Sequence, residues 1–191
     1  MDKKTLKSVI LLAIIFNILF LANLIYCIIC GFYGWQISTF ITLFMFAYHF
    51  DIRLLIGAIF TLFIKKNINI LNKKYIVKNW EFNFYNKLRV KSWKDKYFVM
   101  DKSQFVMTNN LDVILKNNIC AELIHIFCII FSYLSIIFGC LLSVSEWWLY
   151  LLTAFVASVF IDMLPIIIQR YNRYRLQKIY IKKHKKQQSN C

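Results

Sequence analysis

SVILLAIIFNILFLANLIYCIIC, residues 8–30, runs its whole length without a charged side chain. A helix of about 20 such residues crosses roughly 30 Å of hydrocarbon, so this stretch is long enough to span a bilayer. Three lysines precede it, as in a signal peptide. The apolar part is longer than the core of a cleaved signal, however, and no small-x-small cleavage site follows. We therefore predict that residues 8–30 are a retained transmembrane helix.

Three further stretches have the same character. Residues 120–142 and 147–169 are each about one span long, while residues 35–64 are longer and contain His49, Asp51 and Arg53. This long stretch predicts either one tilted or kinked span or a span followed by a short interfacial helix. The chain of 191 residues is 60% hydrophobic with one Pro, which is too apolar for a soluble domain of this size. We predict an all-α integral membrane protein, a bundle of about four transmembrane helices in a single domain, 1–191.

Basic residues lie on one predicted side of the membrane. Of the 24 Lys and Arg, three precede the first span, and all but one of the rest lie in residues 65–119 or 170–191. Cytoplasmic loops carry the excess of Lys and Arg in membrane proteins. We therefore expect both termini, the segment 65–119 and the basic tail 170–191 to be cytosolic. This placement also accounts for the net charge of +15 without nucleic acid as a partner.

The cytosolic segment alternates lysines with aromatic residues in NWEFNFYNKLRVKSWKDKYF, residues 79–98. As a helix, this stretch places Phe84 and Leu88 on one ridge, with lysines beside it. Such a pattern is typical of a helix lying on an anionic inner leaflet. The alternative is an ordinary cytosolic loop whose lysines only follow the positive-inside rule. We expect the tail beyond residue 178 to be a frayed end bound to the same leaflet.

Few ionisable residues interrupt the predicted spans, and each costs a few kcal/mol unless it has a partner or a function. Asp162 is the natural counter-ion for Arg53, either as a structural pair or as part of a site. Glu122 and His125 lie three positions apart, where a carboxylate can orient an imidazole as a general base. The alternative for this pair is helix packing through hydrogen bonds. Gln169 ends the fourth span, so these groups can converge in the inner half of the bundle.

Other kinds of site find little support in the sequence. No pair of ligands has the spacing of HExxH, and neither a GxSxG, a P-loop nor a GxGxxG motif occurs. We therefore expect neither a metal nor a bound cofactor. The six cysteines show no disulfide spacing, and Cys27 and Cys30 are interpreted as small apolar residues of a span. The sequence leaves the oligomeric state open.

Four motifs occur in a fixed order: YHFDIRLLIG (48–57), WEFNFYNKLRVKSWKDK (80–96), AELIH (121–125) and PIIIQRYNRYRL (165–176). Together they resemble the glycosyl-4,4'-diaponeurosporenoate acyltransferase family, small bacterial membrane proteins of the staphyloxanthin type of carotenoid pathway, and its uncharacterised relatives. The resemblance extends over roughly residues 45–177. One departure is Tyr174, which stands where the family motif usually has proline.

The resemblance implies transfer of a fatty acyl group, from an acyl thioester or ester, to a hydroxyl of a glycosylated isoprenoid lipid. His125, oriented by Glu122, would act as the general base. Arginine forks suit phosphate or headgroup oxygens. The residues expected to bind substrate are His49, Arg53, Trp93, Lys94, Asp162, Gln169, Arg170, Asn172, Arg173 and Arg175. The alternatives are another lipid-modifying membrane enzyme, such as a methyltransferase or reductase, and a lipid-binding protein without enzymatic activity.

Overall fold

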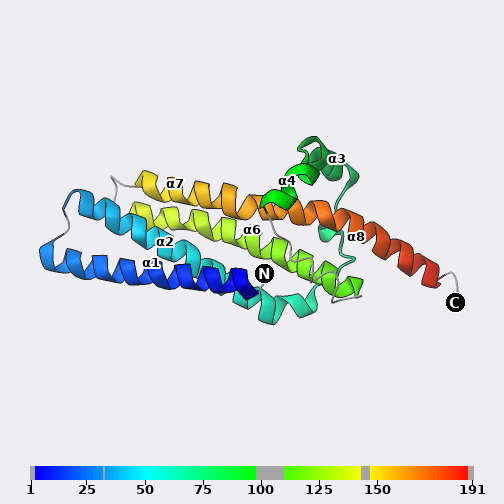
Figure 1. Cartoon of the computed structure of the whole chain (residues 1–191), viewed down its shortest axis with the longest axis horizontal. Coiled ribbons are helices and arrows are strands. Elements are labelled where there is room, and N and C mark those ends of the chain that lie inside the picture. The colour runs from blue at the N-terminus through cyan, green and yellow to red at the C-terminus, as the bar shows by residue number, and fades with distance from the viewer. Residues whose placement is uncertain (1–2, 32, 98–109, 143–146, 189–191) are drawn as a thin grey trace. The chain divides into compact units, whose positions relative to one another are not determined.

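The computed structural model describes residues 3–31, 33–97, 110–142 and 147–188, and every regular element in these ranges is helical (Figure 1). Four helical runs are long and apolar enough to cross a membrane: Leu6–Cys30, Trp35–Asn67, Leu111–Ile137 and Trp147–Lys182. The all-α class is thereby confirmed, and a multi-pass membrane protein is indicated. The side of the membrane on which each terminus lies stays a prediction.

The first two helices follow the predicted spans closely. Helix α1 covers Lys3–Cys30, and α2 covers Trp35–Ile59. A π-helical turn, Phe60–Ile64, and a 3-10 turn, Lys65–Asn67, continue α2 without interruption. Residues 35–64 therefore form one continuous helical run, with no loop that would separate an interfacial helix from the span.

The third helix, α6, extends over Leu111–Leu142 and so begins before residue 120, where the sequence placed its start. Asn110 marks the beginning, because its side-chain Oδ1 accepts a hydrogen bond of 3.1 Å from the backbone N–H of Asp112. Leu115 and Ile119 are fully buried and hold the additional turns in place. The apolar run that defined the predicted span did not include these turns, because polar residues lie between the two apolar positions in the sequence.

The fourth span does not end at residue 169. Helix α7 (Trp147–Val156), a π-helical turn η4 (Ala157–Met163) and helix α8 (Leu164–Gln188) follow one another directly. The basic tail is therefore helical as far as Gln188, which corrects the expected fraying beyond residue 178. Buried side chains on α8, among them Tyr171, Arg173 and Gln177, hold this helix in tertiary contacts beyond its apolar part.

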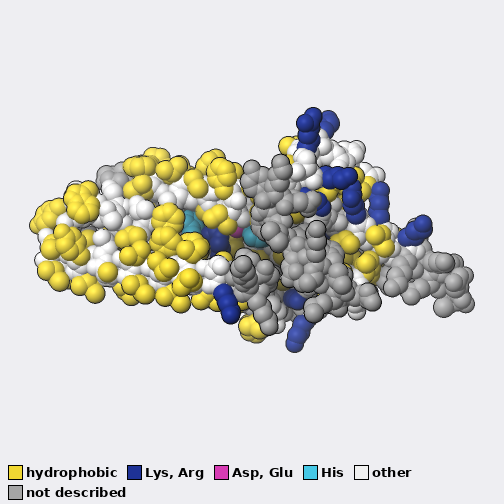
Figure 2. Space-filling view, viewed as in Figure 1, with side chains coloured by type: hydrophobic (Ala, Val, Ile, Leu, Met, Phe, Trp, Pro, Cys, Tyr) yellow, Lys and Arg dark blue, Asp and Glu magenta, His cyan; other side chains and the backbone are white. Residues whose placement is uncertain are grey.

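The chain divides into two compact units. The first unit consists of residues 1–58 and 126–162, hence α1, most of α2, the second half of α6, and α7 with most of η4. Phe16 of α1 stacks on Phe46 and Phe50 of α2, with ring centroids 4.9 and 5.4 Å apart. Tyr48 of α2 donates a 2.8 Å hydrogen bond to the carbonyl of Phe131 on α6. Hydrophobic side chains cover the visible face of these helices, as a lipid-facing surface requires (Figure 2).

The second unit consists of residues 59–125 and 163–191. Its two short helices, α3 (Asn79–Lys87) and α4 (Val90–Tyr97), pack against α8. Within the described residues 79–97, this stretch forms two helices rather than one, because Arg89 adopts the left-handed conformation with φ of 51°. The core of the unit contains Val77, Tyr85, Val90, Ile168, Tyr171 and Tyr174.

Candidate functional site

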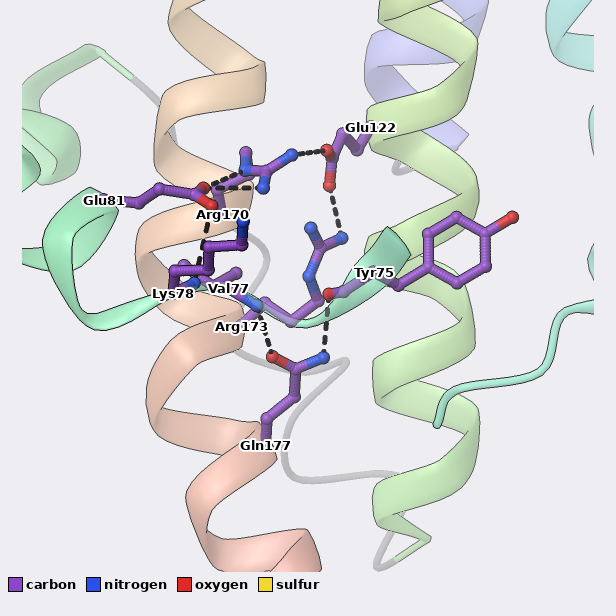
Figure 3. A network of polar contacts seen from close by, with 8 residues as sticks. All are labelled: Tyr75, Val77, Lys78, Glu81, Glu122, Arg170, Arg173 and Gln177. Atoms are coloured by element: carbon purple, nitrogen blue, oxygen red, sulfur yellow. Dashed lines mark hydrogen bonds and ion pairs between the residues drawn. The ribbon is translucent and has the colours of Figure 1, made fainter. Parts of the chain in front are cut away.

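Arg170 ties three helices of the second unit together (Figure 3). From α8 its Nε and Nη2 donate to Glu81 Oε2 on α3, at 2.9 and 2.6 Å. Its Nη1 donates to Glu122 Oε1 on α6, at 2.8 Å. This two-sided contact uses the planar fork of the guanidinium, which a lysine ammonium cannot reproduce.

Arg173 lies one turn further along α8 and is 0% exposed. It forms an ion pair through Nη1 with the second carboxylate oxygen of Glu122 (Figure 3). Its Nε and Nη2 have no hydrogen-bond partner within the described part of the chain. A buried guanidinium with two unused donor nitrogens is costly, at about 1–3 kcal/mol for each unsatisfied group. An oxygen of a bound substrate would relieve that cost.

Glu122 therefore serves two arginines. Each of its carboxylate oxygens contacts a different guanidinium, and the residue is 4% exposed. His125 lies one turn along α6 and is half-buried. The contacts of Glu122 thus provide a role that the sequence did not suggest, the positioning of the buried Arg173 and the half-buried Arg170. The use of His125 as a base stays a prediction.

The loop before α3 is fixed to α8 by Gln177 (Figure 3). The side-chain Nε2 of Gln177 donates to the carbonyl of Tyr75 at 2.9 Å, and its Oε1 accepts from the backbone N–H of Val77 at 3.2 Å. This side-chain amide hydrogen-bonds one backbone carbonyl and one backbone N–H, as the backbone of a neighbouring β-strand would, and so holds the loop in place. Glu81 is thereby placed within reach of Arg170.

Two cations lie close to one tyrosine of α8. The Lys94 ammonium is 5.6 Å from the centroid of the Tyr171 ring, and the Arg175 guanidinium is 5.4 Å from it. Lys94 also donates to Asn172 Oδ1 at 3.0 Å, which joins α4 to α8. Trp93 packs against the same core, where its Nε1 donates to the carbonyl of Leu88. The predicted residues Trp93, Lys94, Asn172 and Arg175 are thus gathered around Tyr171.

Tyr174 occupies the position where the motif usually has proline. Its ring stacks on Phe82 of α3 with centroids 4.0 Å apart, and its hydroxyl donates to Asn79 Oδ1 at 2.8 Å. A proline here would lack both contacts and would break the backbone hydrogen bonding of α8. In this chain, α8 and α3 are joined by the tyrosine instead.

The first unit holds a second buried polar cluster. Arg53 of α2 forms an ion pair with Asp162 of η4, which confirms the predicted pairing. Arg53 Nη1 donates to the carbonyl of His49 at 2.7 Å. The imidazole Nδ1 of His49 lies 3.3 Å from Ser132 Oγ, and its Nε2 is buried without a partner among the described side chains. His49, Arg53 and Asp162 therefore form one cluster, as the sequence suggested.

The sequence did not identify Glu81 as a site residue, and it gave Gln169 a place among the substrate-binding residues without a specific contact. Among the acidic residues described in the predicted basic segment, Glu81 is the one that is buried. An isolated carboxylate among lysines was the sequence feature that could have identified it as a site residue. Gln169 Oε1 is buried with no hydrogen-bond partner in the described ranges. Tyr85 also borders the arginine network, and burial raises the pKa of its phenol, so that it stays protonated and can donate.

Comparison with known proteins bears on this unit. The family model described as glycosyl-4,4'-diaponeurosporenoate acyltransferase matches residues 71–182, more than half of the chain. Three of the four sequence motifs lie inside the match, together with Glu81, Glu122, Arg170 and Arg173, whereas YHFDIRLLIG precedes it. Searches of curated proteins and of solved structures found no match.

Proposed function

Because the chain belongs to the glycosyl-4,4'-diaponeurosporenoate acyltransferase family, we propose that it transfers a fatty acyl group to a hydroxyl of a glycosylated, isoprenoid-type lipid. The observation that carries this proposal is the family match, whose range includes the buried arginine network. Four helices able to cross a membrane suit substrates that are themselves membrane lipids. An acceptor of this kind would reach the protein through the bilayer.

The arginine network supports a division of roles. Arg170 is occupied by two carboxylates and holds the three helices, so we assign it a positioning role. Arg173 keeps two unused donor nitrogens, which suit the carbonyl oxygen of the acyl donor and the negative charge that develops on it during attack. Gln169 would contact the same substrate through its amide.

The residues around Tyr171 suit an anionic part of the donor. Lys94 is half-buried and Arg175 is exposed, and both cations lie within 6 Å of the Tyr171 ring. Either cation can bind an anionic group, and arginine and lysine both bind phosphate. A thioester donor that carries phosphate groups is consistent with this arrangement.

His125 is the proposed base of the reaction. Its imidazole would take the proton of the acceptor hydroxyl while that oxygen attacks the acyl carbonyl. The bond from the carbonyl carbon to the donor's sulfur or oxygen then breaks, and the imidazolium returns the proton to this leaving group. The products are the acyl ester and the free thiol or alcohol, so atoms and charge balance. His49 of the first unit is the rival base, because its Nε2 is buried without a described partner.

The anionic inner leaflet is a further proposed partner. An exposed apolar stripe runs along α3 at four-residue spacing and consists of Trp80, Phe84 and the C-cap residue Leu88. The exposed lysines Lys87 and Lys91 lie beside it in the sequence. Lys and Arg side chains gather over α3 and α4, as Figure 2 shows in dark blue. This stripe combines apolar and basic groups as a leaflet-bound helix does.

The test compares the three histidines of the chain by changing each to glutamine. Lipids from cells that produce each variant are examined by mass spectrometry for an acyl ester of a glycosylated lipid, and the yield is divided by the amount of folded, membrane-inserted protein. His125→Gln should lower this yield by roughly 10²- to 10⁴-fold, as the loss of a general base does. His184→Gln, near the end of α8, is the matched control and should leave the yield near normal.

The other outcomes redirect the proposal. A loss of yield in His49→Gln with a normal yield in His125→Gln would move the base to the first unit. A non-acyl change in the lipids would indicate a different lipid-modifying enzyme. Unchanged lipids in cells with and without the protein, in the presence of a glycosylated isoprenoid lipid, would contradict an acyltransferase role.

A further inference from the structure

Helices α1 and α2 of the first unit form a groove with a volume of about 320 Å³. Aromatic side chains line much of it, namely Phe20, Phe44 and Tyr48, and aliphatic side chains of α2 complete its wall. Asn17 and Asp51 are its two strongly polar residues. A mainly apolar pocket in which a few polar groups set the orientation is the usual form of a site for a small ligand, and this volume lies at the lower end of the range.

The two polar residues contact each other. Asn17 Nδ2 donates to both carboxylate oxygens of Asp51, at 3.0 and 3.1 Å, and also to the carbonyl of Ala13 at 2.9 Å. Asp51 is exposed and forms no ion pair with a residue in the described ranges, whereas Asp162 of the same unit is paired with Arg53. A carboxylate in a membrane span is costly and indicates a functional role by default. Asp51 therefore needs an explanation that the Arg53 cluster does not provide.

A carboxylate beside an amide can accept hydrogen bonds from several hydroxyls at once. The neighbouring aromatic rings offer flat apolar surfaces on which the C–H face of a sugar can lie, and the aliphatic wall suits a hydrocarbon chain. A ligand that fits all three features has a polyol headgroup attached to an apolar tail. A phospholipid headgroup fits poorly, because its phosphate would face the negative charge of Asp51.

We propose that this groove binds the sugar of the glycolipid acceptor, with its hydroxyls on Asp51 and Asn17 and the start of its apolar chain along α2. This assignment rests on the proposed function for the identity of the acceptor. The groove residues lie between Asn17 and Leu55, outside the family match at 71–182. Choice of the acceptor therefore belongs to a part of the chain separate from the residues that the family model covers.

Photo-crosslinking of the full chain in lipid nanodiscs tests the proposal. The probe is an alkyl β-D-glucoside with a diazirine in its chain, and the reference probe is the same diazirine alkyl chain ending in a plain hydroxyl. Labelled peptides are identified by mass spectrometry. The glucoside should label peptides of α1 and α2 in preference to the reference probe. Asp51→Asn and Asn17→Leu should each lower this labelling about tenfold or more, as the loss of hydrogen bonds to a charged group does.

Two variants control the experiment. Asp112→Asn removes a carboxylate from the start of α6 in the other unit and should leave glucoside labelling unchanged. Ala47→Leu fills the groove without altering its polar pair and should lower labelling by both probes. Size-exclusion chromatography of each variant confirms that it is folded, so a loss of labelling cannot result from unfolding.

Equal labelling by the two probes would overturn the proposal, because it would show a groove for ordinary lipid chains. Crosslinked dimers that disappear in Asp51→Asn would also overturn it, because the occupant would then be a second copy of the chain. A separate measurement, acyl transfer, tests the proposed function. His125→Gln should lose acyl transfer and keep glucoside labelling, whereas glucoside labelling without any acyl transfer would contradict the acyltransferase role and leave the sugar site standing.

Discussion

The role assigned to Glu122 differs between the sequence and the structure. In the sequence it stands three positions from the histidine His125 and invites interpretation as that residue's partner. In the structure its two oxygens contact Arg170 and Arg173, and Glu81 provides the second negative charge. Two carboxylates and two guanidiniums balance, so the network is neutral. This balance allows a fully buried arginine to remain charged.

We expect Glu122→Gln to destabilise the protein by about 3–5 kcal/mol, because the buried Arg173 would lose the carboxylate with which it forms its ion pair. For a chain of this size, that corresponds to a fall of roughly 6–20 °C in Tm. Thermal unfolding of the purified protein in detergent measures it. Asp112→Asn, a matched change on the same helix, should lower Tm by much less. An unchanged Tm combined with lost activity would favour the original interpretation of Glu122 as the residue that orients His125.

At the scale of elements, the break between α3 and α4 decides what the basic segment presents to its surroundings. The left-handed backbone at Arg89 ends one short helix and starts another. Tyr85 and Val90, which flank the break, are buried in the core of the second unit. Trp80 and Phe84 are 66% and 52% exposed, so they form an apolar ridge on the outer face of α3.

This ridge should enter an anionic leaflet. Trp80 fluorescence, obtained as the difference between the chain and its Trp80→Phe variant, should be quenched by brominated lipids more strongly in anionic than in neutral vesicles. Changing Lys87 and Lys91 to Gln should remove most of the difference, since each lysine near an anionic surface contributes about 1 kcal/mol. The same change at the exposed lysines Lys73 and Lys74, outside α3 and α4, is the control. Equal quenching in both kinds of vesicle would favour a cytosolic loop.

The expected orientation of the whole molecule in the membrane follows from its charge distribution. The one-sided distribution of Lys and Arg predicts that both termini are cytosolic and that the turn after Cys30 is outside. Cys30 is exposed at the end of α1, and Cys191 is the last residue of the chain. Cys30 and Cys191 thus provide a thiol on each predicted side.

Single-cysteine variants that retain either Cys30 or Cys191 test the topology in intact cells. An impermeant thiol reagent should label the Cys30 variant directly and the Cys191 variant only after the membrane is opened. Each variant serves as the control for the other, since both carry one thiol in the same background. The reverse pattern of labelling would invert the topology.

Four features could be predicted from the sequence: the helical membrane class, the approximate spans, the family resemblance and the pairing of Arg53 with Asp162. These features depend either on energies that sum over neighbouring residues or on a pairing for which the sequence offers few candidates. Hydrophobic transfer sums over contiguous residues, and a buried cation must find one of the few anions available among apolar helices. The resemblance depended on motifs of consecutive residues, and the family match confirms it.

Tertiary packing sets where helix α6 begins, where helix α8 ends and which groups Glu122 contacts. The extra turns of both helices are held by packing that apolar runs do not reveal, such as the buried Tyr171 of α8. Arg170 meets Glu81 across 89 positions of sequence and Glu122 across 48. The energy of an ion pair depends on distance in space and on burial. A residue's nearest charged neighbour in the sequence therefore need not be its partner in the fold.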